Sequence, residues 1–199
     1  KTQAILPLRG KILNVVSAGR EKINANQEII DLVQAIGCKR GEKFNSKDIR
    51  YEKIIIMTDA DVDGAHISTL LMAFFYKEFP KLIDEGHLYL SVPPLYRITK
   101  GSKILYAVND KHKDEIIKKE FKGSEVNINR FKGLGEMMPA QLKETTMSPD
   151  NRTLLKVQIA SKDKKSTLKS VDALMGKKPE LRFKFITENS KKISAEAIL

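Results

Sequence analysis

Residues 53–64 of the chain read Lys-Ile-Ile-Ile-Met-Thr-Asp-Ala-Asp-Val-Asp-Gly, an apolar run that leads directly into three alternating carboxylates. The apolar run predicts a strand at residues 53–57 that is covered on both faces. If the extended geometry continues, its period of two places Asp59, Asp61 and Asp63 on the same side. Carboxylates this close repel one another, so they either take up protons or recruit a cation. Ligation by oxygen alone favours Mg²⁺ or Ca²⁺ over zinc.

Three other interpretations compete with a metal site at this strand end. An EF-hand loop that starts at Asp59 needs a glutamate at its twelfth position, which is Leu70 here. A phosphotransferase motif of the type Asp-x-Asp-x-Thr/Val fails because its fifth position is Asp63. A solvated acidic turn that caps the following helix remains open, and it is the minority interpretation because three carboxylates alternate after the isoleucine run.

The remaining pattern favours an α/β domain with a largely parallel sheet. Residues 65–79 are apolar nearly all round, which predicts a buried helix that Pro80 ends. Further strands are predicted at residues 11–16, 87–92, 95–99, 103–108, 126–130 and 154–159, and further helices at 26–36, 110–121, 141–145 and 180–188. From residue 161 onward the composition predicts a linker rich in Lys and Ser.

The composition of the chain limits which classes of protein are possible. The chain has 199 residues, 41% of them hydrophobic, and a formal net charge of +11. Its basic ends flank an acid-rich centre, and this charge pattern predicts an anionic partner. The single cysteine, Cys38, excludes an internal disulfide framework and a multi-cysteine zinc site. With no long apolar stretch and no signal-peptide pattern, we expect an intracellular protein without a membrane span. The start at Lys1, without a methionine, indicates a piece of a longer protein.

Three smaller motifs carry weak signals when each is taken alone. In PLRGKILN, residues 7–14, Arg9 and Lys11 flank a glycine and could meet phosphate oxygens. In RFKGLGE, residues 130–136, the glycines indicate either a phosphate-facing loop or an ordinary tight turn. His66, in the first turn of the predicted buried helix, either caps that helix or contacts a phosphate.

Taken together and in this order, the motifs PLRGKILN (residues 7–14), IIIMTDADVDGAHI (54–67) and RFKGLGEMMPAQLKETTM (130–147) closely resemble the B subunit of bacterial type II topoisomerases. The resemblance covers nearly the whole chain. It implies a Toprim domain, a Rossmann-like α/β fold, at residues 1–160, followed by a basic tail at 161–199 that leads to the A subunit. The motif LMGKKPELRF (174–183) is more similar to the topoisomerase IV branch than to gyrase.

The resemblance also implies a site. Asp59 and Asp61 match the family's Mg²⁺ ligands, for which Mn²⁺ or Ca²⁺ can substitute, and Asp63 matches a further carboxylate outside the first layer of ligands. The matching DNA-contacting residues are Arg9, Lys11, Asn14, His66, Lys132 and Arg182. The family's catalytic glutamate and first strand correspond to a segment upstream of Lys1, so no residue here is assigned a catalytic role and this piece alone is expected to be inactive.

The implied activity is ATP-driven cleavage, passage and resealing of double-stranded DNA, in which a tyrosine of the A subunit is the nucleophile. ATP binds only to the full-length protein, and two A subunits assemble with two B subunits in the cytoplasm, at the nucleoid. A gyrase B subunit, a non-catalytic DNA-binding or assembly module, and another Toprim enzyme such as a primase or nuclease are the alternatives. The last of these should lack PLRGKILN and KGLGEMMPAQL.

Overall fold

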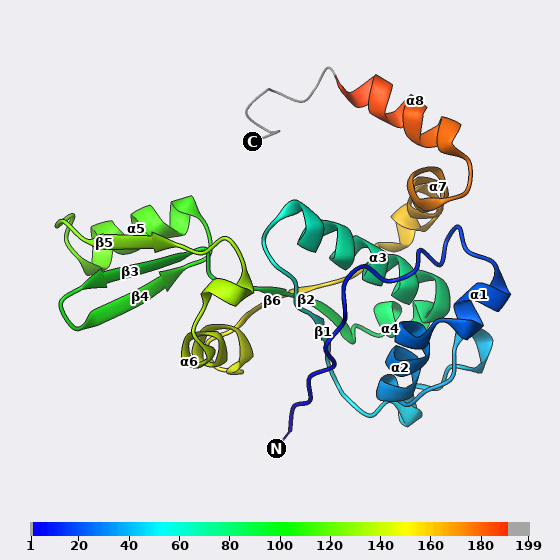
Figure 1. The fold of residues 1–199 in the computed structure, drawn as a ribbon, viewed down its shortest axis with the longest axis horizontal. Helices are drawn as coiled ribbons and strands as arrows, with labels where there is room; N and C mark the ends of the chain where they lie inside the picture. Colours follow the sequence, from blue (N-terminus) through cyan, green and yellow to red (C-terminus); the bar gives the residue numbers. More distant parts are fainter. Residues whose placement is uncertain (1, 191–199) are drawn as a thin grey trace. The chain divides into compact units, whose positions relative to one another are not determined.

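The computed structural model describes residues 2–190, and the chain divides into two compact units. The first, called the sheet unit, comprises Glu52–Thr69 and Gly86–Val157. The second, called the helical unit, comprises the described residues up to Tyr51, the segment Leu70–Glu85 and the described residues from Gln158 onward. Each unit therefore combines segments that are far apart in the sequence, as the colours in Figure 1 show.

The first sheet of the sheet unit carries the acidic segment. Strand β1 (Ile54–Ile56) pairs in parallel with β2 (Leu88–Val92), and β2 pairs antiparallel with β6 (Thr153–Lys156). Ile56 and Leu88 are buried. The isoleucine run forms a strand because branched side chains pack well on a pleated surface, and it ends early, at Ile56.

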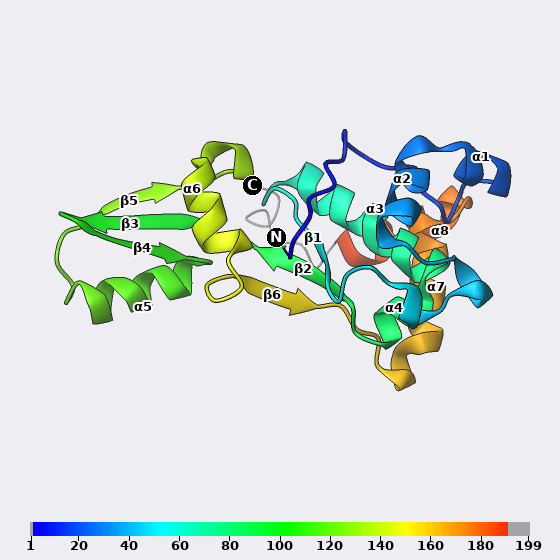
Figure 2. The same ribbon diagram turned by 90° about the horizontal axis from the view of Figure 1, so that it is seen from below.

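The second sheet has the strand order β4-β3-β5, and both of its strand pairs are antiparallel. Helix α5 (Asp110–Glu120) lies along this sheet (Figure 2). The side chains buried in this layer are Tyr96, Ile98, Ala107 and Phe121. The strands are β3 (Tyr96–Lys100), β4 (Lys103–Ala107) and β5 (Asn127–Arg130).

A hydrogen bond joins this sheet to the first turn of α5. The Tyr96 hydroxyl donates to Asp110 Oδ1 at 2.8 Å, and Lys113 donates to the same oxygen at 3.0 Å. The Tyr96 bond is the main reason that the pKa of the Asp110 carboxyl lies below its usual value. The amino terminus of α5 is therefore tied to the sheet as well as capped by Asn109.

The mixed α/β class is confirmed, but the prediction of a largely parallel sheet is wrong for the described residues. Among the described strands, only the β1–β2 pair is parallel. The turn at Gly101, whose φ of +56° suits glycine, joins β3 directly to β4, and such a short connection forces an antiparallel pair. The strand predicted at residues 11–16 is also wrong, because that segment contains a turn and no strand.

The helical unit begins with α1 (Arg20–Ala25) and α2 (Gln27–Ile36). The predicted helix at residues 26–36 is confirmed, because Asn26 caps the amino terminus of α2 by accepting from the Ile29 N–H. Gly37 ends the helix in the left-handed conformation, with a φ of +85°. Cys38 follows as a buried thiol, and this burial raises its pKa.

Four phenylalanine rings pack together in the core of the helical unit. Phe74 and Phe75 lie on α3 (Val62–Glu78), and Phe79 precedes α4 (Pro80–Asp84). The Phe79 ring centroid is 5.6 Å from that of Phe74, 6.2 Å from Phe75 and 6.3 Å from Phe44. The nearly all-round apolar helix predicted before Pro80 is confirmed, and it begins three residues earlier than the sequence indicated, at Val62.

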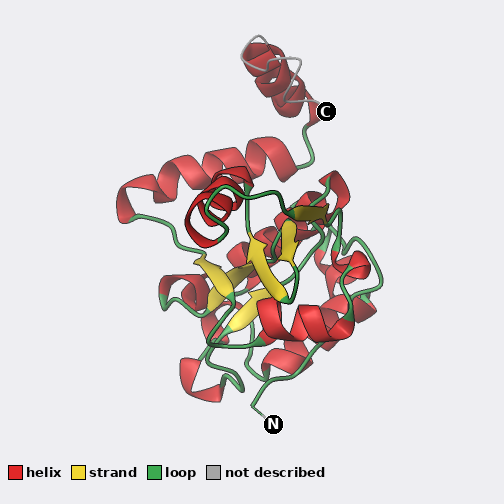
Figure 3. Cartoon of the chain, turned by 90° about the vertical axis from the view of Figure 1, so that its left-hand side faces the viewer, coloured by secondary structure: helices red, strands yellow, loops and turns green. Residues whose placement is uncertain are grey.

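The predicted linker after residue 161 is wrong, because most of this segment is helical (Figure 3). Helix α7 (Lys164–Met175) carries two ion pairs to the rest of its unit, Lys164 to Asp84 at 3.1 Å and Lys77 to Asp172 at 3.5 Å. Helix α8 (Pro179–Ser190) contains the helix predicted at 180–188. Residues 191–199 of the predicted tail lie outside the described residues.

Short turns complete the described part of the chain. Helix α6 (Pro139–Leu142) continues into a π-helical turn at Lys143–Met147. Single 3₁₀ turns occur at Gly41–Lys43, Ser46–Asp48, Leu134–Glu136 and Ser161–Asp163. Within residues 2–190, none of the helices is both long and apolar enough to cross a membrane.

Candidate metal and nucleic-acid site

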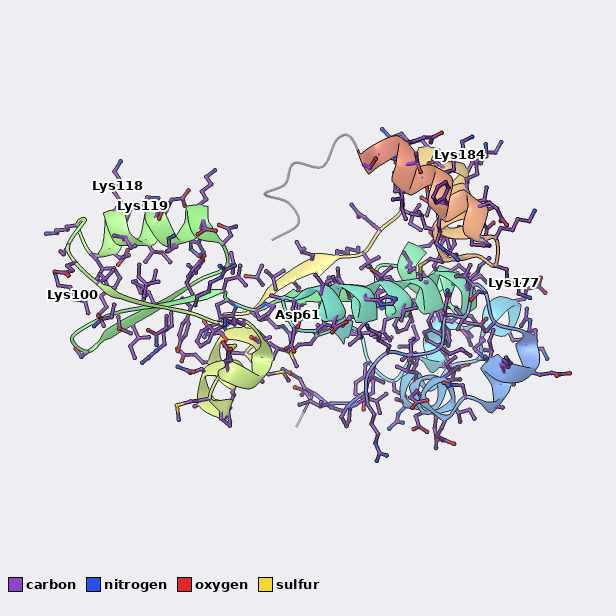
Figure 4. All side chains as sticks on the ribbon, turned by 45° about the horizontal axis from the view of Figure 1, so that its top comes forward. Asp61, Lys100, Lys118, Lys119, Lys177 and Lys184 are labelled. Atoms are coloured by element: carbon purple, nitrogen blue, oxygen red, sulfur yellow. The ribbon has the colours of Figure 1, made fainter. Side chains whose placement is uncertain are left out.

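The acidic segment forms a loop and the start of a helix instead of an extended strand. Strand β1 ends at Ile56 and α3 begins at Val62, so Asp59 and Asp61 lie in the loop and Asp63 in the first helical turn (Figure 4 labels Asp61). The expected alternation through Asp63 is therefore wrong. The physical reason is a cap: Asp61 Oδ1 accepts the Gly64 N–H at 2.7 Å and starts the helix.

The side chain of Asp59 is held by a loop that lies 75 residues away in the sequence. Asp59 Oδ1 accepts the backbone N–H of Leu134 at 2.7 Å. Leu134 belongs to the Gly-rich segment 132–136, here called the glycine loop, in which the Lys132 N–H also donates to Glu136 Oε2 at 2.8 Å. In the sequence, only the two glycines that flank Leu134 hint at this contact.

The backbone of Asp59 passes very close to Gly64. A Cβ at position 64 would lie 2.1 Å from the Asp59 carbonyl oxygen, a distance that no real side chain tolerates. Glycine is therefore required at position 64 by the close approach of two backbone segments. Gly64 thus allows the main chain of Asp59 to lie close to the first turn of α3, and the Leu134 N–H binds its side chain.

The donor set suits a magnesium ion held by few protein ligands. Asp59 and Asp61 are exposed carboxylates, and each uses one oxygen in the hydrogen bonds just described. Mg²⁺ is usually bound through one or two carboxylates together with waters and substrate phosphates. No group of three or more His, Cys, Asp or Glu side chains is arranged to hold a metal in the described part of the chain. Asp59 and Asp61 each keep one carboxylate oxygen outside these bonds, and such an oxygen is the kind of ligand that Mg²⁺ takes.

The other predicted site residues fall into two groups. His66 and Lys132 belong to the sheet unit, as Asp59 does, and both are exposed. The helical unit holds Arg9, Lys11, Asn14 and Arg182. Arg9 and Lys11 are exposed, whereas Asn14 and Arg182 are partly buried.

Asn14 and Arg182 both contact the junction between α7 and α8. Asn14 Nδ2 donates to the Met175 carbonyl oxygen at 2.8 Å, and Asn14 Oδ1 accepts the Val16 N–H at 3.0 Å. Arg182 Nη1 donates to the Gly176 carbonyl oxygen at 2.6 Å. The bond from Asn14 to Met175 ties the early basic segment to the end of α7, and the bond from Arg182 to Gly176 ties α8 to the same junction. The sequence did not indicate these structural uses.

Two family models match most of the chain. The Toprim domain model matches residues 1–93, and the model for the DNA gyrase B subunit, carboxyl terminus, matches residues 123–187. The chain belongs to the B subunits of bacterial type II DNA topoisomerases. The predicted resemblance is thereby confirmed. The first match includes Asp59, Asp61 and Asp63 of this B-subunit segment, and the second includes the glycine loop.

Individual relatives place the segment nearer to topoisomerase IV than to gyrase. It is 60% identical over 189 residues to the B subunit of DNA topoisomerase 4 from Bartonella bacilliformis, covering 94% of this chain and 27% of the relative. The protein of the same name from Caulobacter vibrioides is 57% identical over 196 residues, 98% of this chain and 28% of the relative. The DNA gyrase B subunit of Clostridium acetobutylicum is 49% identical over 193 residues, 96% of this chain and 30% of the relative. The chain thus spans less than a third of the length of these relatives.

Proposed function

We propose that this chain is the Toprim part of a topoisomerase IV B subunit, where it holds Mg²⁺ for the cleavage and religation of double-stranded DNA by a tyrosine of the A subunit. The observation that carries the proposal is the pair of exposed carboxylates between β1 and α3, one of which is fixed by the glycine loop. When bound, the ion supplies positive charge at the scissile phosphate. Asp59 and Asp61 hold the ion, and Asp63 contributes negative charge from the first turn of α3.

The basic residues supply the DNA-binding surface in this proposal. Arg9 and Lys11 are exposed cations beside Gly10, and a cation of this kind neutralises a backbone phosphate whatever the base sequence. Lys132 and His66 provide contacts from the sheet unit. Asn14 and Arg182 act indirectly: Asn14 fixes the early basic segment against the end of α7, and Arg182 fixes the junction between α7 and α8. The segment that begins at residue 161 is the part that leads to the A subunit in this proposal, and ATP binds elsewhere in the full-length protein.

A second candidate function is a DNA-binding or assembly module without metal chemistry. It is favoured by the structural uses of the carboxylates, because Asp61 caps α3 and Asp59 accepts the Leu134 N–H. Metal binding separates the two functions, since a purely structural acidic loop needs no cation.

The deciding experiment is a titration of the 199-residue chain with Mn²⁺, followed by water-proton relaxation. We expect weak binding, because the two carboxylates form a partial site, and we expect it to disappear in the double variant Asp59→Ala, Asp61→Ala. The control is Asp150→Ala, which removes one exposed carboxylate outside the site. Equal binding by the wild type and the double variant would show that these aspartates are not metal ligands.

Binding to DNA is expected to be electrostatic and independent of base sequence. Lys11→Ala should weaken binding to any duplex alike and reduce the slope of log K against log salt by about 0.9 for the lost phosphate contact. Fluorescence anisotropy at several salt concentrations measures both quantities. The charge-matched control is Lys22→Ala, in the exposed last turn of α1. It should change the DNA affinity and the salt slope less than Lys11→Ala does. An effect of Lys11→Ala on one DNA sequence alone would point to base recognition instead.

A further inference from the structure

The glycine loop packs tightly against the side chain of Asp59. A Cβ built on Gly133 would lie 3.0 Å from Asp59 Cγ, 3.1 Å from Oδ1 and 3.2 Å from Oδ2. The whole carboxylate therefore lies against position 133, and these distances are shorter than ordinary side-chain contacts. The Leu134 N–H then binds Oδ1 at 2.7 Å.

We propose that the glycine loop is a positioning device for the metal ligand Asp59: Gly133 leaves room for the carboxylate, and the Leu134 N–H fixes its rotation. The inference rests on the proposed function, since it concerns the same ion. Gly133 and Leu134 are positioning residues, because they act through Asp59. Hydrogen bonds that orient a ligating carboxylate commonly change metal affinity about 10- to 100-fold when they are removed.

Gly133 is not required for its backbone conformation. Its φ of −162° and ψ of 171° are extended values that any residue adopts. The preference for glycine therefore comes from the space that Asp59 occupies, because an added Cβ would push the carboxylate by a few tenths of an ångström. At Gly135, two residues along the same loop, an added Cβ would meet nothing within 4 Å, and the φ of this glycine is not left-handed. The loop thus contains its own matched control.

The loop can act as a fixed donor because it is anchored on both sides. The Phe131 N–H donates to the Leu95 carbonyl oxygen at 2.8 Å, and Phe131 and Met137 are both buried. Within the loop, the Glu136 N–H donates to the Gly133 carbonyl oxygen at 3.2 Å, and the Lys132 N–H donates to Glu136 Oε2. A donor held in this way restricts Asp59 to one orientation and leaves its second oxygen for the ion.

The test compares Gly133→Ala with Gly135→Ala in the 199-residue chain. Mn²⁺ affinity from water-proton relaxation should fall at least about tenfold in Gly133→Ala and stay unchanged in Gly135→Ala. In metal-free protein, the amide proton resonance of Leu134 should move upfield in Gly133→Ala and in Asp59→Ala, because both changes break the bond to the carboxylate. It should not move in this way in Gly135→Ala. Circular dichroism of both variants should match the wild type, which separates a local change at Asp59 from a loss of structure.

A second variant removes the donor without adding volume at position 133. Leu134 is the first residue of a 3₁₀ turn, a position where proline is tolerated, and proline replaces both the N–H and the leucine side chain. Leu134→Pro should lower Mn²⁺ affinity as Gly133→Ala does. Binding that disappears in Asp59→Ala but persists at wild-type strength in Gly133→Ala and Leu134→Pro would overturn the positioning role and leave the metal site standing. Binding that persists in Asp59→Ala would overturn the metal site itself.

Discussion

In a topoisomerase B subunit that carries this segment, Asp59→Ala should lower DNA cleavage at least about a hundredfold while ATP hydrolysis and assembly with the A subunit persist. The loss follows because a metal ion at a reacting phosphate is worth several kcal/mol of transition-state stabilisation, and each ~1.4 kcal/mol is a factor of ten in rate. Asp59 is exposed and lies in a loop, so removing its charge should cost little stability. Assays of supercoiled-plasmid cleavage and of ATP hydrolysis on the same variant measure the expected loss and the activity that should persist.

Asp59→Asn sharpens this test. The asparagine side chain retains an oxygen that can accept the Leu134 N–H, but it lacks the negative charge that a cation needs. Cleavage should therefore be lost in Asp59→Asn as well, although the contact to the glycine loop is retained. A folded Asp59→Ala subunit that hydrolyses ATP and cleaves DNA at the wild-type rate would return the acidic loop to a structural role.

The largest loss of stability is expected for Phe79→Ala. Phe79 is fully buried, and its ring contacts the rings of Phe44, Phe74 and Phe75. Removing a buried phenylalanine ring typically costs about 3–5 kcal/mol, from lost burial and from the cavity that remains. Since the free energy of unfolding of a whole domain is only about 5–15 kcal/mol, this change should remove a large part of it.

Urea denaturation followed by circular dichroism measures this loss. Phe183→Ala is the matched control, because Phe183 on α8 is 72% exposed and should change the unfolding free energy by less than about 0.5 kcal/mol. A similar small effect for both substitutions would mean that the four-ring cluster does not stabilise the helical unit.

Much of the local structure was predictable because it depends on neighbouring residues. The caps at Asn26 and Gly37 delimit α2, and the apolar run before Pro80 forms α3. The segments predicted as strands before and after the turn at Gly101 form β3 and β4. In each case the signal and the structure lie within one short stretch of chain, so side-chain periodicity and turn chemistry were sufficient.

The details of the candidate site were less predictable. The aspartates could be singled out from their spacing, but the helix cap at Asp61 ended the extended geometry on which that argument relied. The bond from Leu134 to Asp59 uses a backbone N–H, which every residue except proline has, so apart from the two flanking glycines the sequence carries no mark of it. The helix α7 was missed because its lysine-rich surface resembles a solvated linker, although its ion pairs to Asp84 and Lys77 hold it in place.

The hydrogen bond between Asn14 and Met175 has a consequence for the order in which the chain folds during synthesis. The two residues are 161 positions apart, and ribosomes add about 5–20 residues each second, so the acceptor is made roughly 10–30 s after the donor. All segments of the sheet unit, which ends at Val157, are made before Met175. The helical unit needs its earliest and latest segments together. A nascent chain therefore passes through a stage in which every described strand has been synthesised while Asn14 still lacks its partner, and a ribosome stalled within α7 would trap that stage.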